Sequence, residues 1–216
     1  MKQVLSDIDK SLLNVSLKEA ESITRAQIVL ATTGRSDSYP EIPWKAFAFG
    51  ASVAGFAVFV LDLIIRFWIN DATILLIVTT ILVSGALLAL LALFCPAFAR
   101  LFVSELRREA ETLQYAESMF LSNELFATSD RRGILLLISV FERRVVIIPD
   151  QGVRDRLNTD ILKNIIEKMI QPLKSGEVRK ALETGLDELK NAICPPLPEG
   201  GEKDQLSDKI IEGDTK

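Results

Sequence analysis

The stretch ATILLIVTTILVSGALLALLALFCPAF, residues 72–98, decides the fold because it contains no charged side chain from end to end. A helix needs about 20 predominantly apolar residues to cross the roughly 30 Å hydrocarbon layer of a membrane. A second apolar run precedes it, from about residue 42 to 68, and its charges Asp62 and Arg66 lie near one end. Only a few residues separate the two runs. The sequence therefore predicts a transmembrane helical hairpin over residues 43–98, with spans at about 43–68 and 72–98.

The charges around the hairpin predict its orientation. Basic side chains concentrate on the cytoplasmic side of membrane helices. Here Arg66 is the only basic residue at the tip, whereas several flank the apolar runs on the other side: Arg35, Lys45, Arg100, Arg107 and Arg108. We expect a two-pass protein of the inner (plasma) membrane, with both termini and the domain in the cytoplasm. Asp62 and Arg66 share a helix face, and we interpret them as a pair near the membrane interface.

Composition narrows the classes of function. The chain has 216 residues, with Lys plus Arg at 25, Asp plus Glu at 29, a formal net charge of −4 and no histidine. This balance argues against a nucleic-acid partner, since such proteins normally carry a basic surplus. The lack of histidine excludes Ser-His-Asp and Cys-His catalysis and zinc sites that use histidine. Two cysteines cannot form a disulfide framework, and no glycine-rich nucleotide loop occurs.

The remaining residues show strand and helix patterns together. Residues 27–33 are typical of a strand, and so are two continuous apolar runs, 134–141 and 145–148, separated by a tight turn. Continuous rather than alternating apolar runs indicate strands covered on both faces. Pro149 ends the second run because it has no N–H to donate.

Helices are predicted between and around these strands. The first opens at a capping box, Ser16 to Glu19, and amphipathic stripes predict others over about 102–122, 161–170 and 178–193. Pro172 is expected to end the helix predicted over 161–170. The predicted fold class is therefore α/β, a small mixed sheet with helices on both faces, interrupted by the transmembrane hairpin. This split domain comprises residues 1–42 and 99–194, and the tail 195–216 is expected to be disordered.

Polar side chains gather at one predicted edge of the sheet. If the run 145–148 returns beside 134–141, the ends of the two runs bring together Asp130, Arg131, Arg132, Asp150 and Gly152. If the strand 27–33 is parallel to the last strand, it adds Arg35, Ser36 and Asp37 to the same edge, where ligands bind in open α/β sheets.

This edge predicts a candidate cation site. The carboxylates of Asp37, Asp130 and Asp150 would hold a hard cation such as calcium or magnesium, and Arg35 or Arg132 would meet a phosphate. The alternative interpretation is that Pro149, Asp150 and Gly152 form a turn and that the other residues are solvated loop charges.

Short motifs run through the predicted domain: RGILLLIS at 132–139, ERRV at 142–145 and DQGV at 150–153. Ala116, Phe120 and Thr128 precede them, and EAESIT at 19–24 is followed by QIVL at 27–30. Together these motifs resemble the TPM domain family, and the inserted hairpin resembles a bacterial membrane branch of that family.

The resemblance implies a compact α/β/α domain but little about activity, since family members are linked to acid phosphatase activity, photosystem repair and divalent-cation binding. It implies Asp150 and Gly152 as a cation or phosphate site. Two functions stay open. The first is a membrane-anchored protein-interaction factor that assembles or maintains a membrane complex, with a membrane or cytoplasmic protein as partner. The second is a divalent-cation-dependent, acid-phosphatase-like phosphoester hydrolase. The sequence favours the first because it assembles no catalytic group.

Overall fold

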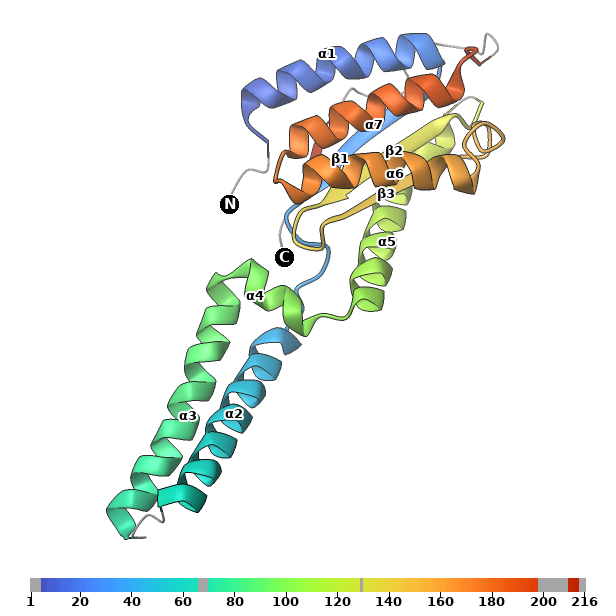
Figure 1. Cartoon of the computed structure of the whole chain (residues 1–216). Coiled ribbons are helices and arrows are strands. Elements are labelled where there is room, and N and C mark those ends of the chain that lie inside the picture. Colours follow the sequence, from blue (N-terminus) through green and yellow to red (C-terminus); the bar gives the residue numbers. More distant parts are fainter. Residues whose placement is uncertain (1–4, 66–69, 129, 198–209, 214–216) are drawn as a thin grey trace. The chain divides into compact units, whose positions relative to one another are not determined.

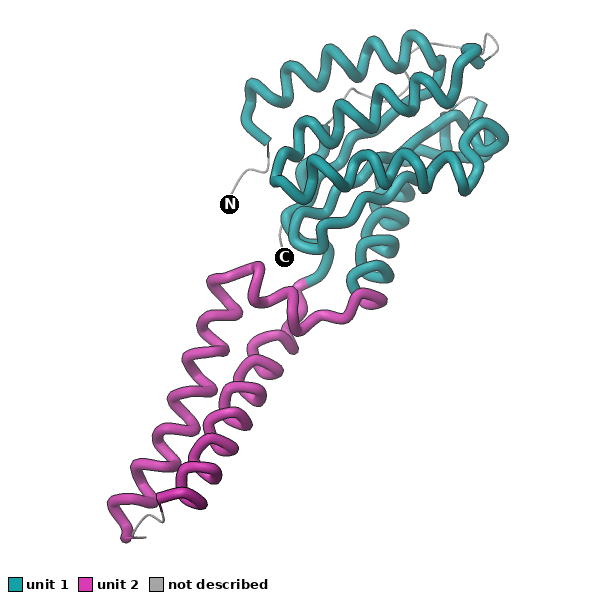
Figure 2. Tube along the Cα trace, viewed as in Figure 1, with its two compact units in different colours: residues 1–37, 108–216 teal, residues 38–107 magenta. Residues whose placement is uncertain are grey.

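The computed structural model describes residues 5–65, 70–128, 130–197 and 210–213. They form two compact units, Met1–Asp37 with Arg108–Lys216, and Ser38–Arg107 (Figure 2). We call the first the α/β unit and the second the hairpin unit, and each is described by itself.

A four-stranded mixed sheet of order β3-β2-β1-β4 lies at the centre of the α/β unit (Figure 1). β1 (Gln27–Thr33) and β2 (Gly133–Ser139) are parallel along their whole length. β3 (Arg144–Pro149) is antiparallel to β2. The three predicted strands are confirmed: β1 has the predicted ends, and the ends of β2 and β3 differ by one or two residues from the sequence prediction.

The fourth strand, β4 (Ile211–Gly213), comes from the tail that the sequence predicts to be disordered. It pairs in parallel with the last three residues of β1, from Ala31 to Thr33. Ile211 packs against the apolar cluster on one face of the sheet. The prediction of disorder is therefore wrong for these residues, whereas 198–209 and 214–216 lie outside the described part of the chain.

Helices cover both faces of the sheet, which confirms the predicted α/β class (Figure 1). One face packs against α1 (Asp7–Thr24), α6 (Thr159–Lys174) and α7 (Val178–Ile193), and the other packs against α5 (Glu105–Ser122). Side chains alternate between the two cores as strand geometry requires. The first core takes strand residues such as Ile28, Leu30 and Leu136, while the second takes Val29, Ala31 and Leu135.

Two helix ends differ from the sequence prediction. α1 begins at Asp7, where Ser6 and Asp9 form the capping box, so the box predicted at Ser16 to Glu19 is wrong and lies inside the helix. α6 continues through Pro172 to Lys174. A proline so close to the end of a helix removes one of the last hydrogen bonds, and the helix ends within the same turn.

The hairpin unit contains α2 (Glu41–Ile65) and α3 (Asp71–Phe94), which are both long and apolar enough to cross a membrane. They approach closely at two glycines: a Cβ on Gly50 would lie 2.9 Å from Ser84 O, and one on Gly85 would lie 2.8 Å from the Phe47 ring. Small residues allow such close packing between membrane helices.

The second helix is shorter than the predicted span 72–98. α3 ends at Phe94, Cys95 is extended, and Pro96 begins the short helix α4 (Pro96–Ala99), which η1 (Arg100–Phe102) follows. A proline disfavours helical geometry in the residue before it, which explains the break at Cys95. Asp62 lies on α2, and Arg66 lies outside the described residues.

Candidate functional site

The sheet places the residues of the predicted cation site at its two opposite ends. β1 is parallel to β2 rather than to β3, so the residues that follow β1 lie beside the β2–β3 turn. Asp37 follows β1, whereas Asp130 precedes β2 and Asp150 follows β3 at the other end. The expected meeting of Asp37 with the other two aspartates therefore does not occur. In the part of the chain that the structure describes, no group of three metal-binding side chains is placed to hold an ion.

At the Asp150 end, the buried carboxylate is held by its neighbours. Arg131 donates from Nε to Asp150 Oδ2 at 3.2 Å and from Nη2 to Oδ1 at 3.0 Å, and the Gln151 N–H donates to Oδ1 at 2.7 Å. Asp130 forms an ion pair with Arg132, with 3.1 Å between Oδ2 and Nη2. The two carboxylates thus face arginines, and binding of calcium or magnesium at this corner stays a prediction.

Gly152 has a structural role at the same corner. Its N–H donates to Arg131 O at 2.8 Å, and a Cβ on it would lie only 2.2 Å from Asp130 O. No side chain fits there unless the backbone moves. This geometry favours the alternative interpretation of the sequence, in which Asp150 and Gly152 form a turn.

The opposite end of the sheet contains a buried carboxylate, that of Glu142, which the sequence predicts only as part of the tight turn between the two apolar runs. Glu142 is 1% exposed. Its Oε1 accepts from the Ser36 N–H at 2.9 Å, and its Oε2 accepts from the Ser139 hydroxyl. Ser36 Oγ lies 3.0 Å from Ser139 Oγ and 3.5 Å from Thr112 Oγ1. These four residues, called the Glu142 cluster, join the loop after β1, the end of β2 and α5.

The Glu142 cluster lies where parallel strands end, which is where ligands bind in many α/β sheets. Here the carboxylate accepts hydrogen bonds from the chain itself. Arg35 is similarly engaged, since its guanidinium lies 4.2 Å from the centre of the Phe141 ring. The cluster therefore fixes the loop after β1 against the end of β2, and we call this arrangement the clamp. In the sequence, the one indication of it was a glutamate at the junction of a predicted strand and its turn.

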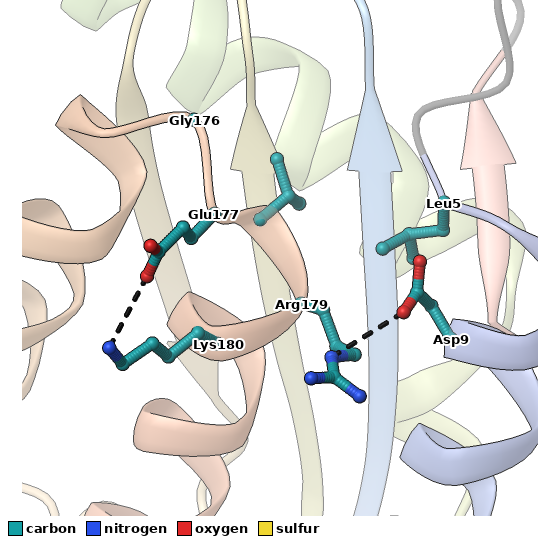
Figure 3. A pocket seen from close by; sticks show the side chains of 7 residues that line it. Leu5, Asp9, Gly176, Glu177, Arg179 and Lys180 are labelled. Carbon is teal, nitrogen blue, oxygen red and sulfur yellow. Dashed lines mark ion pairs between the residues drawn. The ribbon is translucent and has the colours of Figure 1, made fainter.

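A hollow of about 490 Å³ opens between the first turns of α1 and α7 (Figure 3). Its charges are paired: Arg179 Nε lies 3.4 Å from Asp9 Oδ1, and Lys180 Nζ lies 3.3 Å from Glu177 Oε2. Hydrogen bonds from Ser6, reinforced by the Arg179 charge, hold the pKa of Asp9 below its ordinary value of 3.8. These contacts stabilise the two helix starts, and among the described residues that line the hollow the charged groups pair with one another rather than converge on a ligand.

The outer face of α1 carries apolar side chains that the fold does not bury. Ile8, Leu12 and Val15 are 72%, 45% and 68% exposed. Their spacing places them on one side of the helix, and we call them the α1 stripe. The core-facing side of the same helix is occupied by Leu13 and Leu17, which are fully buried. α1 is thus apolar on two sides, and only one side has a partner within the described chain.

Comparison with known proteins finds a domain match over part of the chain. Residues 98–192 match the model of the TPM domain. The match covers the predicted motifs from Ala116 to Val153, and it begins within α4, so α1, β1, α2 and α3 lie outside it. A solved structure with a similar fold is the NMR structure of the BA42 protein from the psychrophilic bacterium Bizionia argentinensis.

That likeness has a TM-score of 0.58 at 14% sequence identity and covers 99% of this chain and 98% of BA42. At this identity it shows the fold alone. A comparison with curated proteins gave no match. The TPM domain match therefore supports the α/β architecture. Support for a function comes from the exposed surfaces of the α/β unit.

Proposed function

We propose that the protein is a membrane-anchored protein-interaction factor that helps to assemble or maintain a membrane complex. The hairpin unit is the anchor, because α2 and α3 have the length and composition of membrane-crossing helices. The basic flanks favour a cytoplasmic place for both termini and for the α/β unit. The α1 stripe is the observation that carries the binding role.

Burial of the α1 stripe would stabilise a complex appreciably. Removing one Val, Leu or Ile side chain from water is worth about 1.5–3 kcal/mol. Because Ile8, Leu12 and Val15 are already partly buried, the three together offer about 3–6 kcal/mol, from which the cost of association must be subtracted. A surface of this kind suits the apolar centre of a protein interface with a charged rim.

The charge of α1 favours a protein over a lipid surface as its partner. The helix contains the acidic residues Asp7, Asp9, Glu19 and Glu21 against two lysines, at positions 10 and 18. Helices that lie on anionic membranes are instead rich in Lys and Arg on their polar face. A net acidic helix with an apolar stripe suits a partner protein that presents basic side chains beside an apolar groove.

Photo-crosslinking in native membranes tests this proposal. A photoreactive residue at Leu12, inside the α1 stripe, is expected to give a discrete protein adduct, and the same residue at the exposed Asn164 of α6 is the matched control. Ile8→Lys with Val15→Lys should abolish the Leu12 adduct without lowering the thermal midpoint, because both side chains are exposed. An adduct that survives both lysines, or one of equal yield from Asn164, contradicts the proposal.

A further inference from the structure

β4 shows that one edge of the sheet accepts an added strand. An edge strand presents unpaired N–H and C=O groups, which a further extended segment can pair with. At the start of β1 this edge is closed, because the Ile28 N–H donates to Glu21 Oε1 at 2.8 Å. The Gln27 N–H donates to Arg132 O on the other side, as the alternation of a strand requires. Strand addition is thereby restricted to the end of β1, where residues 31–33 pair with β4, and we call this edge the β1 slot.

The β1 slot contacts the side chains of the strand that occupies it. Glu212 Oε1 accepts from the Leu5 N–H at 3.2 Å, and Glu212 Oε2 lies 3.0 Å from Lys10 Nζ. A Cβ on Gly213 would lie 2.0 Å from Tyr115 Oη. The slot thus favours an acidic residue followed directly by glycine.

The two residues before Glu212 are apolar and alternate between the faces of the sheet. Ile210 packs against the core formed with α1, α6 and α7, and Ile211 packs against the core formed with α5. Together with Glu212 and Gly213 they define a four-residue pattern of apolar, apolar, acidic and glycine residues. An added strand of this kind draws affinity from its backbone and specificity from alternate side chains.

The contacts of β4 are few enough to be exchanged. It pairs over three residues, and the ion pair between Glu212 and Lys10 is partly exposed, with side-chain exposures of 24% and 27%. Exposed ion pairs contribute only about 0–1 kcal/mol. A free strand with the same contacts can therefore compete for this edge, at a disadvantage set by the covalent connection of β4 to the chain.

We infer that the β1 slot binds an extended segment of a partner protein with the pattern apolar, apolar, acidic, glycine, and that the chain's own tail is its intramolecular competitor. The partner strand would run parallel to β1 and replace β4. This inference deepens the proposed function by naming the chemistry of a bound segment, and it uses a surface other than the α1 stripe.

Peptide binding to the full chain in detergent micelles tests the slot. The probe is a fluorescein-labelled peptide LSDKIIEGDTK, residues 206–216 of this chain. The receptor variant carries Ile211→Asp with Gly213→Val, so that its own tail no longer fits. This variant is expected to bind the peptide at least about tenfold more tightly than the wild-type chain, because the tethered competitor has been removed.

Two controls examine the recognised side chains. A peptide in which the glycine is replaced by valine should bind at least about tenfold more weakly, and Lys10→Ala in the receptor variant should weaken binding of the native peptide by a few-fold. Equal binding by the wild-type chain and the variant, or equal binding of the native and valine peptides, overturns the inference. Should the double substitution impair folding, Glu212→Lys, which changes only a partly exposed side chain, opens the slot instead and is judged by the same outcomes.

Failure of the slot and failure of the proposed function are distinguishable. The peptide assay needs no natural partner, and the crosslinking assay reports on Leu12 of the α1 stripe. No peptide binding together with a lysine-sensitive Leu12 adduct removes the slot and leaves the protein-interaction role.

Discussion

Replacing Glu142 by alanine is the most direct test of the clamp at the ends of β1 and β2. The change removes the acceptor of the Ser36 N–H, 2.9 Å away, and of the Ser139 hydroxyl, at a position only 1% exposed. A buried donor left without a partner costs about 1–3 kcal/mol, so two predict a loss of about 2–6 kcal/mol in the free energy of unfolding. We expect a value of about 3 kcal/mol, because the two serine hydroxyls lie 3.0 Å apart and can pair with each other.

Thermal unfolding of the full chain in detergent micelles, followed by circular dichroism at a fixed scan rate, measures this loss. For a chain of this size, about 3 kcal/mol lowers the midpoint by about 6–12 °C. Arg143→Ala is the matched control, since Arg143 is the exposed next residue of the same turn and its replacement should change stability by less than about 0.5 kcal/mol.

Ser139, whose hydroxyl donates to Glu142, allows a second test by unfolding. In the Glu142→Ala background the Ser139 hydroxyl has already lost its carboxylate acceptor and keeps only its contact with Ser36 Oγ, 3.0 Å away. Ser139→Ala should therefore cost less stability in that background than in the native chain. The reasoning is refuted if Glu142→Ala melts within about 2 °C of the Arg143→Ala control, or if the effects of Glu142→Ala and Ser139→Ala simply add.

Two further predictions concern other corners of the α/β unit. Gly152→Ala should lower the free energy of unfolding by about 1–3 kcal/mol, because its Cβ would lie 2.2 Å from Asp130 O; the same melting assay checks this, and an unchanged midpoint would contradict it. Ser6→Ala should raise the pKa of Asp9 toward 3.8, since hydrogen bonds from Ser6 hold it lower in the native protein. A group with a lowered pKa stabilises the fold above its unfolded value and loses that contribution as pH falls through the folded value. NMR titration of the Asp9 carboxyl carbon below pH 3.8 measures the shift, and an identical pKa in both proteins would disprove this cause.

The apolar pattern of the sequence was sufficient to predict the central strands and the layers around them. β2 is buried at every position, so its apolar run is continuous and indicates helices on both faces. β4 lacked such a signal, because Ile211–Gly213 is too short to show a period. It pairs with Ala31–Thr33 of β1, and its side-chain contact with Lys10 is equally far away in the chain. The start of α1 was missed for a related reason, since Ile8 and Val15 lie outside the buried stripe.

The candidate site depended on a choice that apolar patterns cannot make. The strand 27–33 has the same apolar pattern whether it is parallel to β2 or to β3. That choice moves Asp37 from one end of the sheet to the other, and with it the whole predicted cation site. Glu142 was overlooked because its acceptor role depends on Ser36, 106 residues away in the chain.

The pairing of β1 with β2 also constrains how the hairpin unit can meet a membrane. The two strands are parallel neighbours over all seven residues of each strand, yet α2 and α3 lie between them in the chain. A single crossing would leave β1 and β2 on opposite sides of the bilayer, where they could not pair, so both helices cross or neither does.

The ends of the inserted hairpin unit lie close together as well. Arg107 Nη1 is 2.6 Å from Glu41 Oε1, and Lys45 Nζ donates to Phe102 O at 3.1 Å. Parallel strands need a crossover connection, and α5, packed on one face of the sheet, supplies it. An insertion with adjacent ends leaves that crossover unchanged and adds little loop-closure entropy, since this cost grows only slowly with loop length. An α/β domain can therefore carry a two-helix insertion between two paired strands without any change in the topology of its sheet.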